Sequence, residues 1–113
     1  MPLARFSKAL MLLVVPALAV AGAARADDQI VITLKNDQFT PAEVTLPANT
    51  DVTLKFVNDD PAAAEIESKD LKIEKVVAGN SEITVHVHTQ EPGRYLFVNE
   101  YKEDTVKGYI IVN

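Results

Sequence analysis

Carboxylates are the side chains in this sequence whose types and spacing most directly suggest chemistry. Glu65 and Glu67 are two residues apart in a segment with an extended pattern, so their side chains should share one face about 7 Å apart. A second acidic set follows at Glu100, Glu103 and Asp104. Carboxylate oxygens suit hard cations such as iron and manganese. The alternative is a solvated acidic rim, whose ion pairs with surface lysines contribute ~0–1 kcal/mol each.

The only two histidines, His86 and His88, form an H-x-H pair. On a strand, both imidazoles would lie on the face opposite Val85 and Val87. Zn²⁺, Cu²⁺ and Ni²⁺ bind such pairs when a third donor is near. Two exposed histidines that simply titrate are the alternative, and the motif by itself leaves both interpretations open.

Conventional catalysis is not indicated. The chain contains four glycines and no glycine-rich phosphate loop, and Ser68 and Ser81 lack a histidine at any motif spacing. The catalytic possibility that survives is metal oxidation at the acidic residues. That reaction would need an electron acceptor from a partner.

The first 26 residues have the features of a secretory signal peptide. A basic start precedes an apolar run over residues 9–20, and an A-x-A site occupies residues 24–26. The apolar run is shorter than the ~20 residues that span a bilayer. We therefore expect export to the periplasm, no membrane anchor after cleavage, and one domain over residues 27–113.

That predicted domain is acidic and free of sulfur. It holds eight Lys/Arg against all 16 Asp/Glu, because three of the 11 basic residues lie in the predicted signal peptide, and its net charge is therefore −8. Nucleic acid and anionic lipid are poor partners for such a charge, whereas cations and basic protein surfaces fit it. The chain has no cysteine, and Met1 and Met11 precede the domain. Burial of apolar side chains must hold the fold together without disulfides.

From Gln29 onward, apolar and polar residues alternate with the period of two that is typical of β-strands. In one such segment Val52, Leu54 and Phe56 are expected to face inward. Residues 58–79 are less regular and are interpreted as a long connection that contains a short strand and a helical turn. About seven strands without internal repeats predict an all-β, Greek-key β-sandwich.

Four stretches of the sequence share features with one family. They are F-T-P-A-E-V-T-L-P-A at residues 39–48, V-T-L-K-F-V-N-D at 52–59, A-E-I-E-S-K-D-L at 64–71, and P-G-R-Y-L-F at 92–97 with K-G-Y-I-I-V at 107–112. Together they resemble the cupredoxin family, and in particular the small periplasmic cupredoxin-like proteins associated with bacterial iron uptake. The resemblance covers nearly all of the predicted domain and implies the cupredoxin type of sandwich.

The resemblance also shows where a blue-copper centre would hold its ligands. Type 1 copper needs two imidazoles and a thiolate, often with a distant thioether. In the family's register the thiolate position is Asn99, and the two histidine positions are at Ala64-Glu65 and at Lys102. The thioether position is close to Val106. Every expected ligand is replaced, so blue-copper electron transfer is not expected, and the Lys102 ammonium would neutralise nearby carboxylates.

Finally, the resemblance implies that the two acidic sets meet at one end of the sandwich. The implied metal site comprises six residues: Glu65, Glu67, Glu100, Lys102, Glu103 and Asp104. Its cation would be iron, or copper at a site unlike type 1. The implied function is a periplasmic accessory protein of iron uptake that binds or relays Fe²⁺/Fe³⁺, or docks onto an oxidoreductase, an iron permease or a periplasmic iron-binding protein.

Two alternatives remain open. The first is a metal-free interaction module that keeps the cupredoxin shape, because a fold does not establish a function. The second is a protein that binds Cu²⁺ or Zn²⁺ through His86 and His88.

Overall fold

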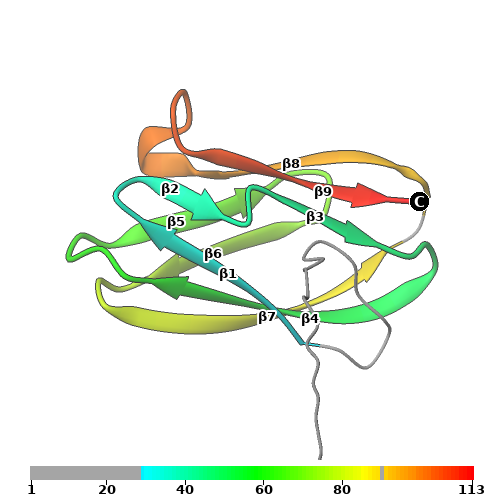
Figure 1. The fold of residues 1–113 in the computed structure, drawn as a ribbon, viewed down its shortest axis with the longest axis horizontal. Coiled ribbons are helices and arrows are strands. Elements are labelled where there is room, and N and C mark those ends of the chain that lie inside the picture. Colours follow the sequence, from blue (N-terminus) through cyan, green and yellow to red (C-terminus); the bar gives the residue numbers. More distant parts are fainter. Residues whose placement is uncertain (1–28, 90) are drawn as a thin grey trace, which may run out of the picture.

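The computed structural model describes residues 29–89 and 91–113. Within these residues nine strands form two sheets that pack face to face (Figure 1). The strands are β1 (Gln29–Lys35), β2 (Gln38–Thr40), β3 (Glu43–Leu46), β4 (Thr50–Asn58), β5 (Ala64–Ser68), β6 (Ile73–Val77), β7 (Ser81–Thr89), β8 (Gly93–Asn99) and β9 (Lys107–Val112). A short 3-10 turn, η1 (Glu100–Lys102), follows β8. The predicted all-β sandwich is confirmed.

One sheet has the strand order β2-β1-β4-β7 and the other the order β3-β9-β8-β5-β6. Two pairs, β1 with β4 and β3 with β9, are parallel, and the remaining pairs are antiparallel. The chain changes sheet repeatedly, so residues far apart in the sequence become neighbours. In particular, β5 contacts both β6 and β8, and η1 lies close to β5.

The core lies between the two sheets, where alternate residues of each strand point inward. Val52, Leu54 and Phe56 of β4 are buried as predicted. Phe56 belongs to an edge-to-face group with Phe39 of β2 and Phe97 of β8, in which Phe97 lies 4.8 Å from the ring centroid of Phe39 and 5.7 Å from that of Phe56. Such contacts add about 0.5–1.5 kcal/mol each beyond the area they bury. These aromatic rings tie the two sheets together.

The prediction of a helical turn within residues 58–79 is wrong, because the structure places strands β5 and β6 there with a turn between them. Ile73 and Val77 are four residues apart and both buried, and the three residues between them are exposed. A spacing of four residues is also the spacing of one helical turn. The segment is a strand because it pairs with β5, from Ala64↔Val77 to Ser68↔Ile73.

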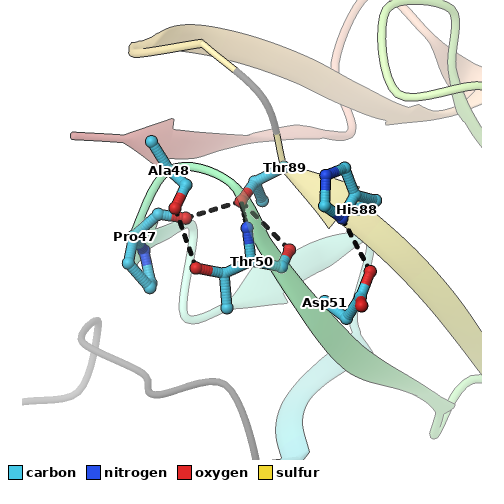
Figure 2. Close-up of polar contacts among 6 residues, drawn as sticks. All are labelled: Pro47, Ala48, Thr50, Asp51, His88 and Thr89. Carbon is cyan, nitrogen blue, oxygen red and sulfur yellow. Dashed lines mark hydrogen bonds and ion pairs between the residues drawn. The ribbon is translucent and has the colours of Figure 1, made fainter.

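Two connections are fixed by side chains. The buried hydroxyl of Thr89 accepts a hydrogen bond from the Thr50 N–H (3.1 Å) and donates one to the Pro47 carbonyl (2.5 Å), which holds the β3–β4 connection against the end of β7 (Figure 2). At the β1–β2 turn, the carboxylate of Asp60 accepts from the N–H groups of Asn36 (2.7 Å) and Asp37 (3.1 Å).

The predicted signal peptide, residues 1–26, lies outside the described residues. Among residues 29–89 and 91–113, no helix is long and apolar enough to cross a bilayer.

Candidate metal site

Three of the positions that the family resemblance assigns to blue-copper ligands are buried and packed in this structure. Ala64 and Val106 are each 1 % exposed and Asn99 is 3 % exposed. The side-chain oxygen of Asn99 accepts hydrogen bonds from the backbone N–H of Glu65 (3.1 Å) and from that of Tyr101 (3.2 Å). A buried amide with partners on two segments is a structural group, and its role here is to connect β5 with η1.

Outside this packed layer, three carboxylates converge from three different elements. Glu65 is on β5, Glu74 on β6 and Glu100 on η1, and one oxygen of each lies within 4.8 Å of the others. Glu65 points outward because its neighbours Ala64 and Ile66 point into the core. Glu100 follows Asn99 directly, so the hydrogen bonds of Asn99 hold both carboxylates at the same edge.

Crowding of negative charge is the main electrostatic feature of this group. The pKa of Glu100 is raised above its ordinary value of 4.5 by partial loss of solvent, then by the charge of Glu65 and a hydrogen bond with it, and to a lesser extent by Glu74 and Glu103. Like charges at this spacing disfavour full ionisation. A bound cation would relieve the repulsion, and three carboxylates are the donors that hard cations take.

The other predicted acidic residues have different places. Glu67 and Glu103 line a surface groove of about 300 Å³ together with Glu100, and the apolar side chains of Leu96 and Val98 form part of its lining. Asp104 is exposed and belongs to neither the three-carboxylate group nor the groove lining. Of the residues predicted from sequence, the structure therefore brings Glu65 and Glu100 together, and it adds Glu74, which the sequence analysis missed.

Lys102 was expected to neutralise the acidic residues, and the structure gives its ammonium a different partner. Nζ of Lys102 lies 2.8 Å from an oxygen of Asp37, at the β1–β2 turn. The pKa of Lys102 is raised, first by the hydrogen bond to Asp37 and then by the charge of that residue. The three-carboxylate group thus keeps its negative charge.

His86 and His88 lie on the exposed face of β7, as expected from the alternation with buried Val85 and Val87. They are outside the three-carboxylate group. His88 is close to the start of β8, whereas Glu100 follows the end of that seven-residue strand, which spans about 20 Å. Histidines and carboxylates therefore occupy different parts of the sandwich.

A family model described as the cupredoxin-like domain matches residues 8–112, which is nearly the whole chain. The chain belongs to this family. This cupredoxin-like chain is similar in sequence to the uncharacterized protein RP394 of Rickettsia prowazekii (strain Madrid E). The two are 35% identical over 85 residues, which cover 75% of this chain and 68% of the relative.

Solved structures agree with the family assignment at the level of the fold. The metal-binding domain of the Cu(I)-exporting P-type ATPase CopA of Streptococcus pneumoniae D39 matches with a TM-score of 0.71 and 20% identity over 84% of this cupredoxin-like chain and 99% of the domain. Auracyanin A, a blue copper protein of Chloroflexus aurantiacus, matches with a TM-score of 0.66 and 17% identity over 76% of this chain and 98% of its own. The fold thus resembles that of copper-binding domains.

Proposed function

We propose that this protein is an exported accessory protein of metal handling, which carries iron as Fe²⁺ or Fe³⁺ on the carboxylates of Glu65, Glu74 and Glu100. The observation that carries the proposal is the convergence of these three carboxylates from β5, β6 and η1 to within 4.8 Å. The sequence resemblance to iron-linked cupredoxin-like proteins supports iron as the cation, and the predicted signal peptide supports the periplasm as the compartment.

The chemistry of the group fits a carrier that loads and releases its cargo. All three ligands are hard oxygen donors, which favour iron or manganese over Cu⁺. Glu74 is exposed, and Glu65 and Glu100 are half-buried, so a cation reaches the group directly from solvent. A rigid sheet edge holds two of the ligands, and the Asn99 hydrogen bonds hold the third.

Next to the carboxylates lies a surface suited to a partner. The groove that includes Glu100 has an apolar part, Leu96 and Val98, and an acidic rim that includes Glu67 and Glu103. A complementary partner surface would present apolar side chains flanked by lysines or arginines. In the proposed function this partner is the iron permease, or a periplasmic iron-binding protein, that receives the cation.

Calorimetric titration with Fe²⁺ under anaerobic conditions tests the carrier function. Wild-type protein should bind one ion per chain, and Glu65→Gln/Glu74→Gln/Glu100→Gln should bind at least about tenfold more weakly. The matched control is Asp59→Asn/Glu91→Gln/Asp104→Asn, which removes the same number of charges from exposed positions outside the group and outside the groove that adjoins it. Equal loss in both variants would mean that only overall charge attracts iron, and no binding by the wild type would favour the metal-free interaction module.

A further inference from the structure

Strand β7 forms a long edge of the sandwich (Figure 1). It is the last strand in the sheet order β2-β1-β4-β7, and β4 pairs with all nine of its residues in one continuous register. The other edge strands are shorter, with three residues in β2, four in β3 and five in β6. Edge strands are commonly protected from other chains by a lysine, a proline, a bulge or a short length. The sequence of β7, S-E-I-T-V-H-V-H-T, has none of these features.

The hydrogen-bond pattern decides which backbone groups of β7 reach the open edge. The Asp59 N–H donates to the Leu34 carbonyl (2.8 Å), so odd-numbered residues of β4 turn their backbone groups towards β1 and even-numbered residues turn theirs towards β7. Phe56 is opposite Ile83, so the odd-numbered residues of β7 bond to β4. The others turn their N–H and C=O groups to the open edge, where no strand among residues 29–89 and 91–113 pairs with them. These residues are Glu82, Thr84, His86 and His88.

A second copy of β7 fits this edge in one register. When two β7 strands run antiparallel about a two-fold axis at Val85, all nine residues of each strand overlap. Glu82 then lies opposite His88 of the second copy, and Thr84 lies opposite His86. Each of these pairs exchanges two backbone hydrogen bonds, which gives roughly eight bonds across the interface. A slip of one residue would place apolar side chains opposite polar ones, so this register is strongly favoured.

Charges on the outer face complement one another in the same register. Within one chain, Glu82 lies 2.7 Å from Nζ of Lys55, and His88 lies 2.7 Å from an oxygen of Asp51 (Figure 2). Pairing of the two copies joins these ion pairs into a row Lys55–Glu82–His88–Asp51, in which positive and negative groups alternate once His88 is protonated. The two-fold axis produces the row twice. Opposite charges in directly opposed positions stabilise strand pairs.

The inner face of β7 is also suited to a second copy. Ile83 is half-buried at this edge and packs against the core, whereas Val85 and Val87 are buried. In the paired register Ile83 lies opposite Val87 of the second copy, and the two Val85 side chains lie opposite each other. Pairing therefore extends the apolar core from one chain into the next.

We propose that this protein forms a two-fold homodimer in which β7 pairs antiparallel with β7 of a second copy, centred on Val85. The two four-stranded sheets then become one continuous sheet. Such an interface uses the same surface on both copies and closes on itself, so it removes the open edge without building a filament. The proposal concerns the β7 edge alone and does not rest on the proposed function.

Sedimentation equilibrium of untagged protein tests the dimer. Measurements from about 10 μM to about 1 mM, at about pH 6, where imidazoles generally carry a proton, should show a reversible monomer–dimer equilibrium. His88→Lys keeps a positive charge opposite Glu82 and should retain the dimer, whereas His88→Glu opposes two carboxylates and should weaken it at least about tenfold. Circular dichroism checks that both variants fold. A wild type that stays monomeric throughout, or equal dimerisation of the two variants, would overturn the proposal.

Cysteine cross-linking tests the register independently, because the chain itself contains no cysteine. Directly opposed residues of a hydrogen-bonded pair have Cα atoms about 5.5 Å apart, which suits a disulfide. A mixture of Thr84→Cys and His86→Cys proteins should therefore form a disulfide-linked product with one chain of each. Either variant alone is the control and should cross-link much more slowly, since its cysteines would be diagonal neighbours about 7–8 Å apart. Cross-linking of the mixture no faster than that of each variant alone would contradict the pairing centred on Val85.

Discussion

The side-chain oxygen of Asn99 accepts a hydrogen bond from the backbone N–H of Glu65 at 3.1 Å, which joins the end of β8 to the start of β5. The same oxygen accepts from Tyr101 N–H, one residue beyond Glu100. A single buried amide thus sets the relative position of two of the three carboxylates. Asn99, which the family resemblance places at the thiolate position, thus organises a group of carboxylates on the surface.

Replacing Asn99 should therefore affect both stability and iron binding. Asn99→Ala removes the acceptor of the part-buried N–H groups of Glu65 and Tyr101, and the loss of two hydrogen bonds costs about 1–3 kcal/mol of unfolding free energy. Urea denaturation followed by circular dichroism measures this loss, and calorimetry should show weaker Fe²⁺ binding. A wild-type urea midpoint in Asn99→Ala would contradict the structural role assigned to the amide.

The raised pKa of Glu100 predicts that this residue lowers the free energy of unfolding of the metal-free protein in a pH-dependent way. Because the folded state favours the protonated form, the cost is absent below the ordinary value of 4.5 and complete once the pH exceeds the raised pKa. Glu100→Gln should accordingly raise the urea midpoint at neutral pH, and the gain should fade as the pH falls below that range. The matched control, Glu91→Gln near the opposite end of β8, should show no such gain. A lower midpoint in metal-free Glu100→Gln at neutral pH would contradict the crowding of charge.

Asp60 should show the opposite pH dependence. The backbone N–H groups of Asp37 and Asn36 lower its pKa, so its contribution to stability is complete above the ordinary value of 3.8 and is lost as the pH falls through the lowered pKa. Asp60→Asn should lose roughly 1 kcal/mol at neutral pH, and the loss should shrink as the pH falls below 3.8. Urea titrations over a series of pH values measure this, with the neighbouring exposed Asp59→Asn as control. Equal losses for the two variants at neutral pH would exclude a specific role of Asp60 at the β1–β2 turn.

Much of the fold could be predicted from local patterns. Val52, Leu54 and Phe56 alternate with polar residues, and the structure buries all three, because a half-buried strand requires this period of two. Strand β6 could not be predicted in this way. Ile73 and Val77 are its only buried residues, and the pairing partner that makes them a strand lies in β5.

The same limit explains what could be predicted of the carboxylate group. Glu65 and Glu100 were expected because they flank positions that the family resemblance identifies. Glu74 has no local signal, since its place beside them depends on the β5–β6 register, which the local sequence does not reveal. The partner of Lys102 could not be predicted from local sequence either. Asp37 is 65 residues away in the sequence and contacts Lys102 only when the β1–β2 turn folds against η1.

Anomalous diffraction from crystals soaked with Fe²⁺ tests the central claim most directly, because it locates the ion without any assumption about affinity. The proposed function predicts an anomalous peak at the iron absorption edge between the carboxylates of Glu65, Glu74 and Glu100, with oxygen as the only protein donor atom. A peak elsewhere, for instance at His86 and His88, or no peak in a fully soaked crystal whose three carboxylates are free of lattice contacts, would contradict it.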